Sequence, residues 1–243
     1  MSVILLAAGY GTRLYPLTKD RPKALLDLGD RVILDPMIEG LRAIRRVSRI
    51  VLVTNHYFVK AFEAWRQQRR LDLEIVDDGT STPETRCGAI RDLLLGLARV
   101  DACDDVLVLG TDNLFGWSVS DFVASAKTHA PAPSIAVGTV ASEDEAKQYG
   151  VVKLDGNGRI TQFVEKPAQP PSLTIALCVY YFPASTRGRI HEFVQRGGNV
   201  DAPGFFIEWL VKQDATYGVV MQGAWFDIGT PESYHQAVSQ WGA

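Results

Sequence analysis

The chain has 243 residues, of which 47% are hydrophobic and 22% are charged, and its formal net charge at pH 7 is −3. This length supports either one α/β domain with a large core or two small domains. The charge gives no electrostatic reason to expect nucleic acid or an anionic membrane surface as a partner. No apolar run reaches about 18 residues, the length at which a membrane-spanning helix is expected.

The three cysteines are an odd number and none belongs to a C-x-x-C pair (Cys87, Cys103 and Cys178). This pattern argues against a disulfide framework and against a zinc site. Small buried side chains in a reducing compartment are the simplest interpretation. The N-terminus has no basic segment ahead of its apolar stretch, so we expect a first strand rather than a signal peptide, and a cytoplasmic protein.

Through residue 141, short apolar runs alternate with amphipathic stretches, as in βαβ units with a mostly parallel sheet. We therefore expect a doubly wound α/β fold. The expected strands are Val3–Ala7, Ile50–Thr54, Leu73–Val76, Asp105–Leu109 and Ser134–Val140. The expected helices are Pro36–Arg46, Val59–Arg69, Ile90–Arg99 and Ser120–Thr128, the last with Ser120 as its cap.

After residue 141 the pattern changes to that of a hairpin. Asp155-Gly156-Asn157-Gly158 is a strong turn signal, and the runs Val151–Leu154 and Ile160–Val164 flank it. We expect one compact unit in which this half adds a small substrate-binding lobe. The remaining expected elements are strands at Leu173–Phe182 and Val219–Gln222, and helices at Ser185–Gln195, Phe205–Lys212 and Pro231–Gln240.

A Gly-rich turn follows the first strand directly. A backbone that bends at Gly9 and Gly11 exposes N–H groups, and Arg13 and Lys23 add positive charge, so this segment can hold several phosphates. Two other phosphate-binding patterns do not fit. Leu14 occupies the third glycine position of a G-x-G-x-x-G dinucleotide fingerprint, and the Walker A pattern is absent.

Two aspartates lie where an open α/β sheet would bring them to its ligand. Asp112 comes just after the fourth predicted strand, and the carboxyl ends of such strands face the ligand. Asp227 lies in a later turn, before the closing helix. Mg²⁺ prefers a few carboxylates together with phosphate oxygens and water. On local grounds a turn-stabilising Asp112 and a helix-capping Asp227 are the alternatives.

The stretch GYGTRLYPLT, followed by PKAL, resembles the pattern G-x-G-T-R-L-x-P-L-T with P-K-x-L of the sugar-1-phosphate nucleotidyltransferases. The two aspartate segments resemble the G-D-x and W-x-D-x-G-T segments of this family, apart from an inserted Thr111. Two further segments, Tyr149-Gly150-Val151-Val152 and Glu165-Lys166-Pro167, resemble its Y-G-V-V and E-K-P segments. The family includes glucose-1-phosphate thymidylyltransferases, mannose-1-phosphate guanylyltransferases and N-acetylmuramate-1-phosphate uridylyltransferases.

This resemblance implies a Rossmann-like fold of the nucleotide-diphospho-sugar transferase type and assigns roles to particular residues. Arg13 and Lys23 would be catalytic, and Asp112 and Asp227 would hold Mg²⁺. Residues 1–141 would form the nucleotide-binding half, with contacts from Ala8, Gly9, Gly11, Thr12, Arg13 and Gly88. Residues 142–243 would form the sugar-phosphate-binding half, and the contacts expected for that ligand are Asn113, Tyr149, Gly150, Glu165 and Lys166.

The implied reaction converts an NTP and a sugar 1-phosphate to an NDP-sugar and pyrophosphate. The acceptor phosphate is already anionic, so no general base or nucleophilic side chain is needed. A pyrimidine nucleotide, dTTP or UTP, is the expected donor, although segment Asp77–Ile90 lacks the glutamine common in thymidylyl- and uridylyltransferases.

Other functions remain open. One is a GTP-using enzyme of the mannose-1-phosphate type, and another is a cytidylyltransferase for phosphocholine or for a phosphonate or polyol phosphate. A nucleotide-sugar sensor without turnover is the non-enzymatic alternative. Such sensors usually lose a metal aspartate or the P-K lysine, and this chain keeps both, so the enzyme is preferred. We expect small molecules as partners, and a homodimer is an open alternative for the assembly.

Overall fold

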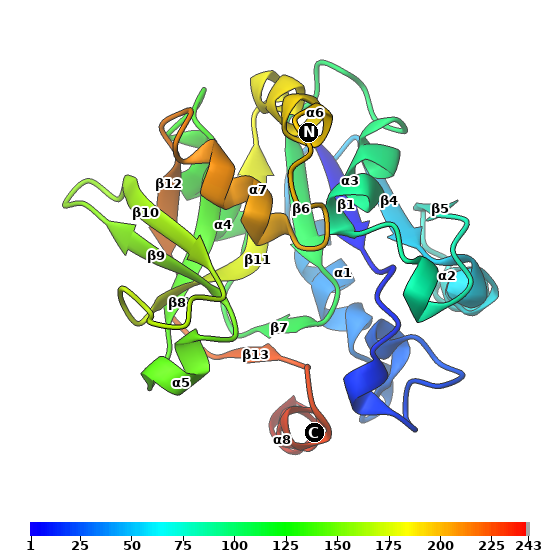
Figure 1. The fold of residues 1–243 in the computed structure, drawn as a ribbon. Coiled ribbons are helices and arrows are strands. Elements are labelled where there is room, and N and C mark those ends of the chain that lie inside the picture. The colour runs from blue at the N-terminus through cyan, green and yellow to red at the C-terminus, as the bar shows by residue number, and fades with distance from the viewer. Residues whose placement is uncertain (242–243) are drawn as a thin grey trace.

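The structure, a computed structural model, describes residues 1–241 and shows a central sheet with helices on both faces (Figure 1). The strands of this sheet are β1 (Ser2–Leu6), β4 (Arg49–Thr54), β5 (Glu74–Asp77), β6 (Val106–Gly110), β8 (Ser134–Thr139), β9 (Gly150–Leu154), β10 (Ile160–Glu165), β11 (Thr174–Phe182) and β12 (Tyr217–Val220). Their order is β10-β9-β11-β6-β1-β4-β5, with β8 paired to β11 and β12.

The sheet changes character between the two halves of the chain. In the first half, β6, β1, β4 and β5 are parallel neighbours, so their carboxyl ends lie at one edge of the sheet. In the second half, β11 runs antiparallel to β6, β8 and β9, and the β9–β10 hairpin extends the sheet outward (Figure 1). The expected doubly wound, largely parallel fold is therefore present at the centre, and the second half joins it through the antiparallel strand β11 and through β12, which runs parallel to β8.

Helices cover both faces because the central strands are apolar on both sides. Successive side chains of a strand point to opposite faces, so Leu5 of β1 packs in the core under α1, α2 and α4, whereas Ile4 packs under α3, α6 and α7. The helices are α1 (Leu34–Arg42), α2 (Val59–Arg69), α3 (Ala89–Leu97), α4 (Val119–Lys127), α5 (Glu143–Ala146), α6 (Arg187–Gln195), α7 (Pro203–Leu210) and α8 (Pro231–Trp241).

Some local predictions were wrong or incomplete. The cap of α4 is Ser118, whose hydroxyl accepts a hydrogen bond from the Asp121 N–H at 3.3 Å, and not Ser120. Ser120 is already within the first helical turn, where its hydroxyl contacts that of Ser118 instead. The sequence patterns also missed α5 and two short strand pairs, namely β2 (Asp27–Leu28) with β3 (Arg31–Val32), and β7 (Asn113–Phe115) with β13 (Trp225–Asp227).

A third, smaller core lies beyond the carboxyl edge of the sheet. Here α8 packs its buried Ala237 against the loops that follow β1, including Leu14 and Leu28. The Tyr234 hydroxyl of α8 also donates a hydrogen bond to the carbonyl of Asp27 at 2.8 Å. The C-terminal helix therefore supports the Gly-rich N-terminal segment, from which it is far away in the sequence.

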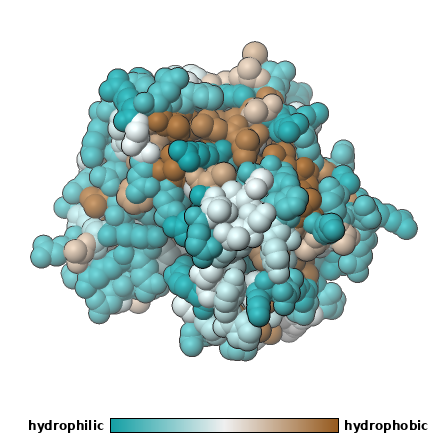
Figure 2. Space-filling view, turned by 45° about the vertical axis from the view of Figure 1, so that its right-hand side comes forward, coloured by the Kyte–Doolittle hydropathy of each residue, from teal (hydrophilic) through white to brown (hydrophobic). Residues whose placement is uncertain are grey.

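The surface in Figure 2 is largely hydrophilic, with apolar residues gathered in a band across the upper part of this face. In the part of the chain that the structure describes, no helix combines the length and the apolar character needed to cross a membrane.

Candidate active site

The Gly-rich loop leaves the carboxyl end of β1 and turns at Gly11, which has a left-handed backbone conformation with φ of 62°. The Thr18 hydroxyl donates a hydrogen bond to the Gly11 carbonyl at 2.7 Å, and a Cβ at Gly11 would lie only 3.2 Å from Thr18 Cγ2. A Cβ at Gly9 would meet nothing within 4 Å. Gly11 is therefore required by the turn, whereas Gly9 leaves the backbone open to a ligand.

Two buried polar residues at the end of β4 hold this loop from below. The Thr54 hydroxyl donates to the Ala7 carbonyl at 3.2 Å, and Asn55 Nδ2 donates to the Ala8 carbonyl at 3.0 Å. Both side chains are fully buried. Sequence reasoning missed this supporting role, because the residues that pair with the loop become neighbours only when β1 and β4 align.

The predicted catalytic lysine is bound to one of the predicted metal ligands. Lys23 Nζ lies 2.7 Å from Asp112 Oδ2. Asn113 Nδ2 donates to the other oxygen, Asp112 Oδ1, at 2.8 Å, and Trp225 Nε1 donates to Asn113 Oδ1 at 2.8 Å. This chain of hydrogen bonds sets the orientation of the Asp112 carboxylate from both sides.

The short strand pair β7–β13 brings the two predicted metal ligands together. It places Asp227 opposite Asn113, and the Ile228 N–H donates to the Asp112 carbonyl at 2.9 Å. Burial and the negative charge of Asp112 raise the pKa of Asp227 to about 6. Burial also opposes ionisation of Asp112, but the charge and hydrogen bond of Lys23 outweigh it and hold the pKa of Asp112 below its usual value.

These carboxylates suit a hard divalent cation. Asp112 and Asp227 come from separate segments, and they are close enough for the charge of one to oppose ionisation of the other. Such a pair matches the preference of Mg²⁺ for a few carboxylates plus phosphate and water. The guanidinium group of Arg13 also lies near Asp227, next to Gly229. A Cβ at Gly229 would be 3.3 Å from Asp227 Oδ2 and 3.6 Å from Arg13 Nη2, so this glycine keeps the space between them open.

A cleft of about 430 Å³ opens beside the two aspartates, which is within the size range of small-molecule sites. Arg13, Asp112 and Asp227 contribute to its wall. The structure also brings into this wall all the residues predicted to contact the sugar phosphate, which are Asn113, Tyr149, Gly150, Glu165 and Lys166. The cleft thus joins residues from both halves of the chain.

Glu165 and Lys166 are neighbours in sequence, yet both line this cleft. β10 ends at Glu165, and Lys166 has a left-handed conformation with φ of 47°, so the alternation of a regular strand stops here. The Lys166 N–H donates to the Tyr149 carbonyl at 3.0 Å. Burial raises the pKa of Glu165, and Glu208 reinforces this while Lys166 opposes it.

Several residues that line the cleft were not among the predicted site residues. Cys178 lies at a bulge in β11, with φ of 55°, and reaches the cleft from the middle of an apolar run. Gly204 begins α7 close to Glu165, because a Cβ there would lie 1.7 Å from Glu165 Oε2. Gln148 and Tyr180 also contribute to the wall. Among these residues, only Gly204 had a possible sequence signal, because the Pro203-Gly204 pair is typical of the start of a helix.

The other predicted nucleotide residues lie outside this cleft. Ala8, Gly9, Gly11 and Thr12 belong to the loop after β1, and Gly88 caps α3 with φ of 92°. A Cβ at Gly88 would lie 2.5 Å from the Val200 carbonyl, so packing alone accounts for a glycine there. The Tyr10 and Thr80 hydroxyls, 3.2 Å apart, connect the loop after β1 to the segment that leads to Gly88.

The carboxyl edge of this α/β sheet combines a Gly-rich loop, the cationic side chains of Arg13 and Lys23, and a pair of carboxylates. These features define a class of phosphate-handling proteins. Residues 2–242 match the nucleotidyl transferase family, and because this match spans nearly the whole chain, the protein belongs to that family.

Its curated relatives include plant and animal proteins. The chain is 29% identical over 244 residues to mannose-1-phosphate guanylyltransferase 1 of Arabidopsis thaliana, covering 96% of this chain and 63% of the relative. It is 30% identical over 240 residues to the mannose-1-phosphate guanylyltransferase catalytic subunit beta of Danio rerio, covering 96% and 62%. The chain therefore spans less than two thirds of the length of these relatives.

Among solved structures, a Bacillus anthracis protein described as a glucose-1-phosphate thymidylyltransferase in complex with sucrose matches with a TM-score of 0.85. The match covers 100% of this chain and 95% of that chain at 21% sequence identity. At this identity the likeness establishes the fold alone.

Proposed function

We propose that the protein is a Mg²⁺-dependent sugar-1-phosphate nucleotidyltransferase, which makes an NDP-sugar and pyrophosphate from an NTP and a sugar 1-phosphate. One observation carries this proposal. Arg13, Asp112 with its bound Lys23, and Asp227 meet in one cleft with the acceptor-side residues. Phosphoryl transfer depends mainly on such alignment and charge neutralisation. The name of the family and the names of the relatives agree with this reaction class.

In this proposal the two halves of the chain hold the two substrates. Residues 1–141 bind the nucleotide. The contacts come from the segment after β1 and from the start of α3, and the contacting residues are Ala8, Gly9, Gly11, Thr12, Arg13 and Gly88. Residues 142–243 bind the sugar phosphate, with Asn113 added from the first half. Glu165 accepts hydrogen bonds from sugar hydroxyls, Lys166 pairs with the anomeric phosphate, and Tyr149 and Gly150 complete this end of the cleft.

The chemical step forms a bond from an oxygen of the acceptor phosphate to the α-phosphorus and breaks the bond from that phosphorus to pyrophosphate. Lys23 stabilises charge on the transferring α-phosphate, and Arg13 stabilises the departing pyrophosphate. Asp112 and Asp227 would hold the metal, which when bound neutralises negative charge on the phosphates. No side chain has to remove a proton, because the attacking oxygen is already anionic.

The identity of the base and of the sugar is a separate question. The relatives are named as mannose-1-phosphate guanylyltransferases, which supports GTP and mannose 1-phosphate as substrates. The pyrimidine nucleotide expected from the sequence has no support in these names. We therefore place GTP beside dTTP and UTP as candidate donors.

The test is a matrix of pyrophosphate-release assays with Mg²⁺. It crosses ATP, CTP, GTP, UTP and dTTP with a set of sugar 1-phosphates and with phosphocholine. Asp227→Asn serves as the control, since it keeps the side-chain size and removes one metal-binding charge. Release with one sugar 1-phosphate that is abolished in the variant would support the proposal and identify both substrates. Release only with phosphocholine, or binding of NDP-sugars without any release, would contradict it.

We also propose that the protein acts in the cytoplasm, where its nucleotide and sugar-phosphate substrates are dissolved and its cysteines stay reduced. The homodimer considered from the sequence stays a prediction. Sedimentation equilibrium would test it, and a single species of 26.7 kDa across the concentration range would contradict it.

A further inference from the structure

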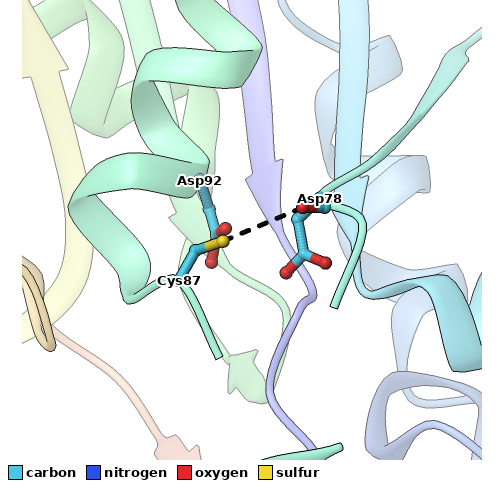
Figure 3. A group of neighbouring side chains, drawn as sticks. All are labelled: Asp78, Cys87 and Asp92. Atoms are coloured by element: carbon cyan, nitrogen blue, oxygen red, sulfur yellow. Dashed lines mark hydrogen bonds between the residues drawn. The ribbon is translucent and has the colours of Figure 1, made fainter. Parts of the chain in front are cut away.

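A second group of potential metal ligands lies at the start of α3, away from the cleft. Asp78 follows β5, Cys87 precedes α3, and Asp92 is in the first turn of that helix. One ligand atom from each of them lies within 4.8 Å of the other two. Figure 3 shows the side chains of Cys87 and Asp92 next to each other and that of Asp78 across from them, with a dashed line from the Cys87 thiol to the Asp78 carbonyl.

Asp92 gives an independent reason to expect a ligand here. Asp92 is only 6% exposed. Its Oδ1 atom is buried and has no hydrogen-bond partner among the residues that the structure describes. A buried carboxylate oxygen without a partner costs free energy, so such atoms are normally paired or coordinate a cation. No lysine or arginine forms an ion pair with Asp92 in residues 1–241.

The other two side chains are positioned but not saturated. Asp78 Oδ1 accepts hydrogen bonds from the Thr80 N–H at 2.7 Å and from the Thr80 hydroxyl at 2.8 Å. These bonds hold the carboxylate in place and leave Oδ2 available to a ligand. Cys87 Sγ has only a long contact, 3.8 Å, with the Asp78 carbonyl. Cys87 is half-buried and unpaired with any other cysteine.

We propose that Asp78, Cys87 and Asp92 form a binding site for one Zn²⁺-like divalent cation. Zn²⁺ accepts thiolate and carboxylate ligands together, whereas Mg²⁺ and Ca²⁺ bind oxygen ligands, so the sulfur selects against the metal proposed for the cleft. Zn–S and Zn–O bonds of about 2.3 and 2.0 Å put tetrahedral ligands about 3.3–3.5 Å apart. Since the ligand atoms lie within 4.8 Å of one another, side-chain rotations that shorten these separations by up to about 1.5 Å suffice. On binding, the thiol releases its proton to solvent as the Zn–S bond forms.

The position of this site connects it to the loop that follows β1. The cation would join the segment after β5 to the first turn of α3, and Thr80, which holds Asp78, also contacts the Tyr10 hydroxyl at 3.2 Å. Three protein ligands leave one tetrahedral position for water. The cysteine spacing argued against a zinc site because the usual zinc patterns contain several cysteines, whereas this proposed site uses one cysteine and two aspartates from separate segments.

The direct test is cation binding measured without any assay of activity. The purified protein is dialysed against Zn²⁺ in a large excess of Mg²⁺, which fills oxygen-only sites, and bound zinc is measured by elemental analysis. Co²⁺ then replaces Zn²⁺ as a spectroscopic probe. We expect about one cation per chain and a thiolate-to-Co²⁺ absorption band in the near ultraviolet. At a Zn²⁺ concentration about 100-fold above Kd, the Tm should rise by about 5–10 °C.

Two variants and one control assign the site. Cys87→Ala should abolish the absorption band and weaken Zn²⁺ binding at least tenfold. Asp92→Asn, which keeps the side-chain shape and relieves a buried charge, should weaken binding by a similar factor while folding normally by circular dichroism. Cys103→Ala, at an exposed cysteine, should change neither quantity. Less than half an equivalent of bound zinc, or a band that survives in Cys87→Ala, would overturn the proposal.

Discussion

At the scale of single residues, the candidate chemistry depends on charges that hold one another in place. Lys23 and Asn113 each bind one oxygen of Asp112, and Trp225 fixes the Asn113 amide from the other side. A lysine prepositioned in this way loses little freedom when the substrate binds. A carboxylate with both oxygens bound also keeps one orientation for a metal.

Lys23→Ala removes the cation that we assign to the transferring phosphate. We expect kcat to fall by about 10²–10³, because removal of one charge-stabilising donor typically costs this much. Initial rates of pyrophosphate release at saturating substrates would measure it. Lys19→Ala, at an exposed lysine four residues earlier, is the matched control and should keep the wild-type kcat. A near-normal kcat for Lys23→Ala would rule out the assigned role.

At the scale of secondary-structure elements, the acceptor end of the cleft depends on the contact of α7 with β10. Glu165 ends β10, its N–H donates to Glu208 Oε2 of α7 at 3.1 Å, and its carboxylate lies against Gly204. Only a residue without a side chain lets the start of α7 come this close. The second half of the chain thereby positions a carboxylate that a hairpin alone would leave free to rotate.

Gly204→Ala tests this contact. The added Cβ would displace the Glu165 carboxylate, so we expect KM for the sugar phosphate to rise about 10- to 100-fold. KM for the NTP should change little, because Glu165 is assigned to the acceptor. Gly188→Ala on α6, where a Cβ meets nothing within 4 Å, is the control. Equal increases in both KM values would indicate general damage to the fold and contradict the assignment.

The amino ends of the parallel strands are joined by Asp104. It accepts hydrogen bonds from the hydroxyls of Ser2 and Ser48 and from the N-terminal ammonium group. The Ser2 and Ser48 bonds are the main cause that lowers the pKa of Asp104 from 3.8 to about 2. Because the folded-state pKa is depressed, the stabilisation is present above pH 4 and is lost as the pH falls from about 4 to about 2.

Asp104→Asn should therefore lower the free energy of unfolding by about 1–2 kcal/mol at pH 7, an estimate reduced for the 23% exposure of the side chain. Urea unfolding followed by circular dichroism at several pH values would measure it. The difference from wild type should shrink toward pH 2, and a difference that stays constant with pH would contradict the prediction. Asp72→Asn, at an exposed aspartate, is the control.

At the scale of the whole molecule, the C-terminal helix packs against the segments that follow β1, close to the Gly-rich loop. The third core, in which α8 packs on the segments after β1, has no counterpart in any local pattern. It supports the segment that carries Arg13 and Lys23, so the stability of α8 and the binding of nucleotide should be linked.

Ala237→Arg introduces a charge into this buried position. We expect a loss of about 3–5 kcal/mol in the free energy of unfolding, the cost of an uncompensated buried charge, and a higher KM for the NTP. Urea unfolding and steady-state kinetics measure the two effects. Gln236→Arg places the same charge on the exposed neighbour and should stay within about 0.5 kcal/mol of wild type. Loss of stability with an unchanged KM would separate α8 from the nucleotide site.

The sequence predicted the main helices and strands and many residues of the cleft. It did not predict the contacts between distant segments that position these residues. The helix Val59–Arg69 has the predicted bounds, and most strands begin or end within one or two residues of their predicted positions. The short pairs β2–β3 and β7–β13 were missed, because strands of two or three residues show no clear alternation. Gly204, Cys178 and Asn55 were missed as well, since their neighbours come from distant segments.

The sequence by itself determined the alternation of strands and helices and the membership of the nucleotidyl transferase family, because periodicity and a long gapless motif are local properties of the chain. Only the tertiary structure decided which charges meet. The ion pair of Lys23 with Asp112, the approach of Asp227 through β13, and the grouping of Asp78, Cys87 and Asp92 all join residues from separate segments. Such contacts arise only when the strands align in register, and that register depends on packing across the whole sheet.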